Sequence, residues 1–101
     1  MRRGRIDFEV VNRAALSVFP DLLQRWIPDG SVRNGEWVAR NPTRNDRKAG
    51  SFLINIRTGK WADFATGDRG GDVVSLVAYI LDISQIEAAR QLGGYLGVIN
   101  E

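Results

Sequence analysis

The stretch that decides the fold is "WADFATGDRGGDVVSLVAYI", residues 61–80. It begins with an aromatic segment typical of a strand, passes through a glycine-rich turn and ends in an apolar segment typical of a helix. Asp72 stands just before the apolar residues, where a short acidic side chain can cap the first turn of a helix. The stretch therefore predicts a strand, a turn and an apolar helix in direct succession.

Upstream of this stretch, the chain contains further strand signals. Apolar and polar residues alternate with period two in "SFLINIR", which is typical of a half-buried strand. Thr58-Gly59 separates this segment from the aromatic one at the spacing of a hairpin turn. We therefore predict three strands, at residues 36–40, 51–57 and 60–64, with loops at residues 28–35 and 41–50.

The remaining segments have helical periodicity. Residues 7–26 carry an apolar stripe of Phe8, Val11, Ala15, Val18, Leu22 and Trp26, while Pro20 predicts a kink or break near Phe19. Further helices are predicted at residues 72–81 and 84–93, the second ended by Gly93-Gly94. The prediction is a single α+β domain, residues 1–101. Its small antiparallel sheet, of three or slightly more strands, packs with one N-terminal and two C-terminal helices.

Composition excludes several kinds of site. The chain has no cysteine and no histidine, which excludes disulfides, thiolate metal sites and the usual nucleophile and acid–base arrangements. We therefore expect no enzymatic activity from these residues alone and no cofactor. No apolar run approaches the roughly 18 residues of a membrane span, and the basic N-terminus lacks the apolar block of a signal peptide. A cytoplasmic protein without membrane contact is expected.

The charge of the chain is unevenly distributed. Residues 33–60 carry seven basic side chains against Glu36 and Asp46, a local charge of +5, whereas residues 61–101 carry a local charge of −4. Twelve of the fourteen cations are arginine, which binds phosphate oxygens in a fork and stacks on flat rings. A basic middle segment is typical of a surface that binds a polyanion, although a solvated polar face has the same composition.

With these elements in order, the chain resembles the N-terminal zinc-ribbon domain of bacterial and phage DNA primases. That family has a helix, a strand ending in Cys-Pro-x-His, a basic loop, a hairpin, and an aromatic strand that runs into Cys-x-x-Cys-Gly and an apolar helix. "NPTRNDRKAGSFLIN", residues 41–55, is similar to the first half of this pattern, and residues 61–80 are similar to the second. The resemblance covers about residues 7–97 and implies a zinc-ribbon-like fold.

The chain departs from the family at the metal. The four ligand positions of the family fall on Asn41, Arg44, Asp63 and Thr66, and none of these offers a thiolate or an imidazole. We therefore expect a metal-free form that is held together by apolar burial, with Trp26, Trp37, Trp61, Phe8, Phe52 and Phe64 available for the core. Arg44 and Asp63, which the resemblance places opposite each other, are expected to form an ion pair.

The resemblance also implies a function. In the primase family this domain contacts single-stranded template DNA through its sheet and neighbouring basic loops, so the partners implied are single-stranded DNA and a replication helicase or primase catalytic domain. A phage, plasmid or integrated element is the expected setting. The candidate nucleic-acid-binding residues are Arg40, Arg44, Arg47, Lys48, Arg57, Lys60, Trp61 and Arg69.

Several alternatives stay open at this point. Trp61 and Trp37 are expected more often in the core than on a binding surface, and Phe52 and Phe64 are expected in the core. The whole domain could instead be a protein-binding module or inhibitor that reuses the scaffold. A weaker reading places magnesium on Asp63, Asp68 and Asp72, although Asp72 is better explained as a helix cap.

Overall fold

The protein is described by a computed structural model that covers residues 6–44 and 49–98. Within these residues it has an α+β fold, as the sequence predicts. The helices are α1 (Phe8–Ser17), α2 (Phe19–Trp26), α3 (Val73–Leu81) and α4 (Gln85–Leu96), and the strands are β1 (Ser31–Arg33), β2 (Glu36–Ala39), β3 (Phe52–Asn55), β4 (Trp61–Asp63) and β5 (Arg69–Gly70). No helix in these ranges is both long enough and apolar enough to cross a membrane.

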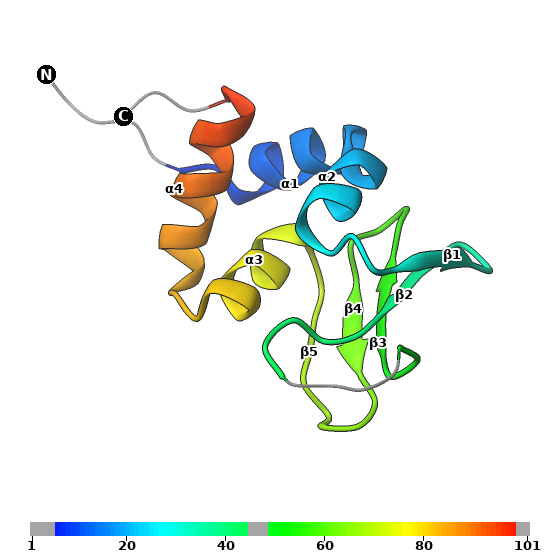
Figure 1. The fold of residues 1–101 in the computed structure, drawn as a ribbon. Helices are drawn as coiled ribbons and strands as arrows, with labels where there is room; N and C mark the ends of the chain where they lie inside the picture. The colour runs from blue at the N-terminus through cyan, green and yellow to red at the C-terminus, as the bar shows by residue number, and fades with distance from the viewer. Residues whose placement is uncertain (1–5, 45–48, 99–101) are drawn as a thin grey trace, which may run out of the picture.

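The five strands form one antiparallel meander in chain order, with the helices gathered to one side of it (Figure 1). Trp37, Ile54 and Trp61 lie directly opposite one another across β2, β3 and β4, and all three are buried. Because successive side chains of a strand point to opposite faces, this row marks the face that the helices cover. Residues one position away in the chain belong to the other, open face of the sheet.

The predicted first helix is broken, as Pro20 indicates. Asp7 caps α1, its carboxylate accepting from the N–H groups of Glu9 and Val10 at 3.0 and 3.3 Å. Val18 leaves the helical conformation, and α2 begins at Phe19 with the proline in its first turn. A proline is tolerated there because the first helical N–H groups have no partner in the helix.

The two C-terminal helices are capped by side chains. Asp72 and Ser75 cap α3 reciprocally, with Asp72 Oδ1 accepting from the Ser75 N–H at 2.8 Å, and Ser84 caps α4. The predicted stop at Gly93-Gly94 is wrong: α4 continues to Leu96 and ends at Gly97, whose φ of +75° favours glycine. Gly93 is buried inside the helix, so close packing outweighs the poor helix propensity of glycine there.

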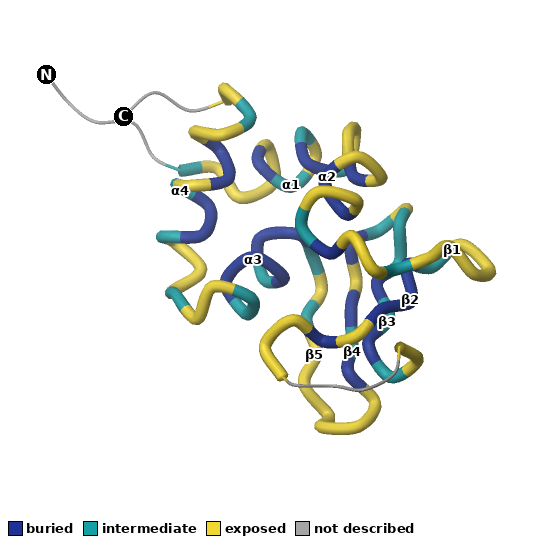
Figure 2. The backbone as a smooth tube through the Cα atoms, in the orientation of Figure 1, coloured by how far each residue is buried: buried dark blue, intermediate teal, exposed yellow. Residues whose placement is uncertain are grey.

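All helices and the covered face of the sheet share one apolar core (Figure 2). The fully buried side chains include Val11 from α1, Phe19 and Leu23 from α2, and Phe52 and Ile54 from β3. The indoles of the two tryptophans in the sheet find partners inside: Trp37 Nε1 donates to the Ile27 carbonyl at 3.0 Å, and Trp61 Nε1 donates to Ser75 Oγ at 2.9 Å.

The structure corrects four further expectations. Residues 31–33, predicted as loop, form the edge strand β1, and residues 69–70 form the short strand β5. Phe64 is not in the core: it is 73% exposed. Phe8 and Val18, placed on the apolar stripe, are each 38% exposed. Breaking the helix at Val18 rotates α2 relative to the stripe, so a single helical face no longer extends from Phe8 to Trp26.

Candidate functional site

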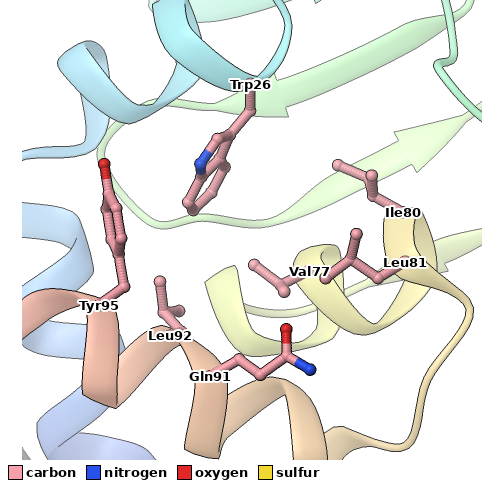
Figure 3. A pocket seen from close by; sticks show the side chains of 7 residues that line it. All are labelled: Trp26, Val77, Ile80, Leu81, Gln91, Leu92 and Tyr95. Carbon is pink, nitrogen blue, oxygen red and sulfur yellow. The ribbon is translucent and has the colours of Figure 1, made fainter.

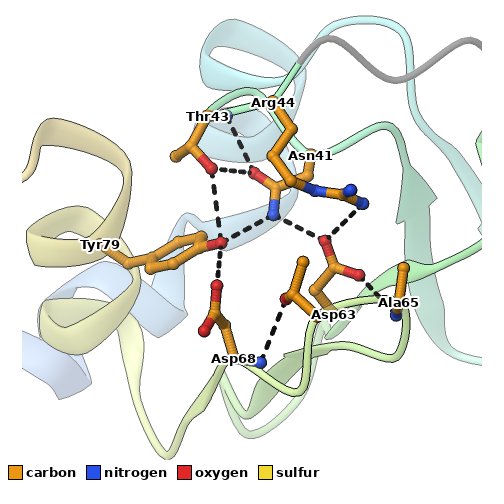
Figure 4. Close-up of polar contacts among 8 residues, drawn as sticks. Asn41, Thr43, Arg44, Asp63, Ala65, Asp68 and Tyr79 are labelled. Atoms are coloured by element: carbon orange, nitrogen blue, oxygen red, sulfur yellow. Dashed lines mark hydrogen bonds and ion pairs between the residues drawn. The ribbon is translucent and has the colours of Figure 1, made fainter.

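Three of the four positions to which the primase resemblance assigns zinc ligands are in direct side-chain contact (Figure 4). Asn41 Nδ2 donates to Asp63 Oδ2 at 2.8 Å, and Arg44 Nη2 lies 3.1 Å from the same oxygen, which confirms the expected ion pair. The other oxygen, Asp63 Oδ1, accepts from the Ala65 N–H at 2.8 Å. The segment after β2 is thereby tied to the end of β4.

Tyr79, on α3, extends this cluster to the helices (Figure 4). Its hydroxyl accepts from Asn41 Nδ2 at 2.8 Å and donates to Asp68 Oδ2 at 2.7 Å. Its ring lies against Trp61, with the ring centroids 4.5 Å apart. Sequence reasoning missed Tyr79; the available signal was a lone phenol in the largely apolar segment "VVSLVAYIL". We call Asn41, Arg44, Asp63, Asp68 and Tyr79 the polar cluster.

The Asp63 carboxyl is ionised inside the protein. Its burial disfavours the charge, but the hydrogen bonds from Asn41 and the Ala65 N–H, together with the positive charge of Arg44, outweigh burial. The pKa of Asp63 consequently lies below its ordinary value. A carboxylate with no solvent exposure and three donors around it is a structural group rather than a free acid or base.

Thr66, the fourth ligand position, lies one turn beyond Asp63 but does not join its side-chain contacts. The Thr66 N–H donates to the Asp63 carbonyl at 3.3 Å, while Thr66 Oγ1 accepts from the Asp68 N–H at 3.2 Å. The magnesium reading is not supported: residues 6–44 and 49–98 contain no group of three or more acidic side chains placed to hold a metal ion. Asp72 serves as the α3 cap instead.

Trp61 is in the core, 5% exposed, so its ring faces are not available to a base. Gly70 explains how the indole is seated. A side chain at Gly70 would collide with the Trp61 indole and with Ser75 Oγ, the atoms that form the indole hydrogen bond. Two of the glycines in "GDRGGD" thus have different roles. Gly67 has a φ of +86°, which favours glycine, whereas Gly70 leaves room for the Trp61 indole.

The predicted cations separate into two groups. Arg40 and Arg44 lie near the end of α2, where Arg40 Nε is 2.6 Å from Asp29 Oδ2, and both line a polar hollow of about 370 Å³. Arg57, Lys60 and Arg69 are exposed on or beside the β3–β4–β5 part of the sheet. Arg47 and Lys48 lie outside the described residues. Arg40 and Arg44 already form ion pairs with Asp29 and Asp63. The exposed side chains of the second group are therefore better placed to bind a phosphate.

The open face of the sheet carries a shallow hollow of about 220 Å³ beside this second group. It is lined by Glu36, Leu53, Asn55, Lys60, Trp61, Ala62 and Phe64. Phe64 stands at its edge with 73% of its surface exposed, and Arg69 pairs across the strands with Ala62 in its floor. Sequence reasoning missed Phe64 as a surface residue because a small domain is expected to bury its aromatics.

A second, apolar cleft lies among α2, α3 and α4 (Figure 3). It measures about 410 Å³ and is lined by Trp26, Val77, Ile80, Leu81, Gln91, Leu92 and Tyr95. Leu81 and Tyr95 are more than half exposed. At its rim Arg25 Nη1 donates to the Tyr95 hydroxyl at 3.1 Å.

Comparison with models of known protein families and with curated protein sequences finds no match for this chain. The relationship to the primase zinc-ribbon domain therefore stays a prediction from the order of the elements and the positions of the ligand-like residues. The geometry itself establishes an α+β domain with a polar cluster whose members Asn41 and Asp63 are buried, and an open, cationic sheet face.

Proposed function

We propose that this domain binds single-stranded DNA on the open face of its sheet, as a non-catalytic accessory of a primase-like replication protein in the cytoplasm. The observation that carries the proposal is the exposed ring of Phe64 beside Lys60 at the hollow of the open face. Proteins that bind single-stranded nucleic acid combine cations, which contact the phosphates, with aromatic rings, on which the bases stack.

The cations of this face are suitably placed for a strand. Lys60 lines the hollow, and Arg69 flanks it on β5. Arg33, on β1, is the cross-strand neighbour of Glu36, on β2. All three side chains are exposed, and none has a hydrogen bond or ion pair with another described residue. Phe64 takes the stacking role that the sequence suggested for Trp61, because Phe64 is accessible and Trp61 is not.

Fluorescence anisotropy with a labelled ten-nucleotide dT strand tests the proposal. If three cations contact phosphates, the affinity for a single strand should fall about 20-fold between 50 and 200 mM salt, given a slope of roughly −0.7 per phosphate neutralised. Lys60→Ala should weaken binding and reduce this slope by about one third, whereas Arg13→Ala on α1 should do neither. Absence of binding at about 50 mM salt would remove the DNA claim, since phosphate contacts are strongest there.

A protein-binding module is the second candidate, and the apolar cleft among α2, α3 and α4 favours it. Contiguous exposed apolar surface on a small domain often marks a protein contact. To separate the two functions, partners are captured from a nuclease-treated lysate with the wild-type protein and with one variant of each surface. A protein partner of the cleft should be lost with Leu81→Glu and retained with Lys60→Ala; a DNA-bridged partner should disappear on nuclease treatment.

A further inference from the structure

At one end of the hollow on the open face, a carboxylate, an amide and an ammonium group lie at adjacent positions on β2, on β3 and just before β4. Glu36 on β2 pairs with Asn55 on β3, and the Asn55 N–H donates to the Lys60 carbonyl at 2.7 Å. The three residues therefore form one row across the open face, at one end of the hollow. The next row, Val38, Leu53 and Ala62, is apolar, and its members Leu53 and Ala62 line the hollow.

The hydrogen-bonding direction of Asn55 is set by the turn that follows it. Asn55 Oδ1 accepts from the N–H groups of Arg57 and Thr58, each at 2.9 Å. Its Nδ2 consequently remains as the donor for a ligand, since no described residue accepts from it. The Glu36 carboxylate and the Lys60 ammonium are likewise without a partner among the described residues.

A carboxylate is an unexpected group on a surface for phosphates, because it repels them. It is suited to the edge of a base that presents N–H donors. The row offers two acceptor oxygens on Glu36 followed by the donors of Asn55 and Lys60. Among the four bases, guanine alone presents two adjacent donors, N2–H₂ and N1–H, next to an acceptor, O6, on its Watson–Crick edge. Unpaired bases are commonly read on this edge while they stack on an aromatic ring.

Resting on the proposed function, we propose that this hollow is a selective site for one unstacked guanine base of the bound strand. Glu36 accepts from guanine N1–H and N2–H₂, Asn55 Nδ2 donates to O6, and Phe64 covers the ring. At about 220 Å³ the hollow is smaller than the pockets that enclose drug-sized ligands, which suits a single base held by a strand on either side. Its neighbours, Arg33 and Arg69, are placed for the flanking phosphates.

The test uses labelled dT₁₀ and three variants of it with a single central dG, dA or dC, in anisotropy titrations at about 50 mM salt. Wild-type protein should bind the dG strand on the order of tenfold more tightly than the others, the discrimination expected of one bidentate contact. Glu36→Gln, which has the same shape but offers a single acceptor, should abolish this preference. Asp21→Asn on α2, which removes the same charge away from the sheet, should preserve the preference.

The outcomes separate this inference from the function on which it rests. Salt-dependent binding of all four strands with equal affinity would overturn the guanine site and leave the DNA function standing. Failure to bind any strand would overturn both. Displacement of the dG strand by free dGMP at matched concentrations would assign the hollow to a free nucleotide rather than to a strand. Circular dichroism of Glu36→Gln establishes that the variant compared is folded.

Discussion

The side-chain amide of Asn41 donates a hydrogen bond of 2.8 Å to the carboxylate of Asp63, and both residues are almost completely buried, with exposures of 1% and 0%. The contact joins the segment after β2 to the end of β4, two places separated by 22 residues. These are positions where the resemblance to primase domains implies metal ligands. Here ordinary polar contacts hold the two segments together, and the apolar core includes the buried aromatic side chains of Phe19, Trp37, Phe52 and Trp61.

Replacing Asp63 by alanine should lower the free energy of unfolding by about 3 kcal/mol, because it removes the acceptor of the Ala65 N–H, one of the two acceptors of Asn41 Nδ2 and the carboxylate that faces Arg44. Urea unfolding followed by tryptophan fluorescence measures the change. Asp21→Ala, on an exposed position of α2, is the control and should change the free energy by no more than about 0.5 kcal/mol. Equal stability of the two variants would show that the polar cluster contributes nothing.

The lowered pKa of Asp63 predicts a dependence of stability on pH. The unfolded chain takes up a proton near the ordinary Asp value of 3.8, whereas the folded protein resists protonation to lower pH. The unfolded state therefore binds more protons in this window, and the stabilisation is complete above about pH 5 and lost as the pH falls through 4 and below. Urea unfolding between pH 7 and pH 3 should show a shallower acid slope for Asp63→Asn than for wild type. Identical slopes would refute the assignment.

Tyr79→Phe should lower the free energy of unfolding by about 1–2 kcal/mol, because the hydroxyl bonded to Asn41 and Asp68 is removed while the ring stays against Trp61. Tyr95→Phe is the matched control, since its hydroxyl accepts from Arg25 on the surface with the side chain 58% exposed. That control should lie within about 0.5 kcal/mol of wild type. Thermal unfolding by circular dichroism compares the two, and a reversed order would contradict the account.

Local sequence patterns were enough to predict most of the helices and strands. Period two placed β3, Asp72 marked the start of α3, and Pro20 marked the break before α2. The Arg44–Asp63 pair came from the resemblance to the primase pattern, not from periodicity. The predicted elements depend on residues close together in the chain, whereas the ion pair was predicted by aligning the chain with the primase pattern.

What could not be predicted depends on packing between distant segments. β1 is exposed at every position, so it lacks the alternation that reveals a strand, and it exists because β2 pairs with it. Phe64 follows Asp63, which points into the core, and strand alternation sends the ring outward despite its hydrophobicity. The role of the Tyr79 hydroxyl depends on Asn41, 38 residues away.

A fourfold substitution tests the relationship to the zinc-ribbon family. Asn41→Cys, Arg44→His, Asp63→Cys and Thr66→Cys restore the ligand types of the family at positions that three contacts bring together. The variant should bind one zinc ion per chain, give a tetrahedral thiolate spectrum with cobalt, and unfold on chelation. Wild-type protein is the control. Failure of the refolded variant to hold zinc would mean that these positions are not arranged as ligands.

The most direct test of the central claim, that the open sheet face binds single-stranded DNA, is the dissociation constant of dT₁₀ for Phe64→Ala compared with Phe8→Ala. Stacking of one base on an aromatic ring is worth about 1–3 kcal/mol, so the loss of Phe64 should weaken binding on the order of tenfold. Phe8, half-exposed on α1 away from the sheet, should be replaceable without effect. Equal affinities of the two variants and wild type would contradict the proposed binding face.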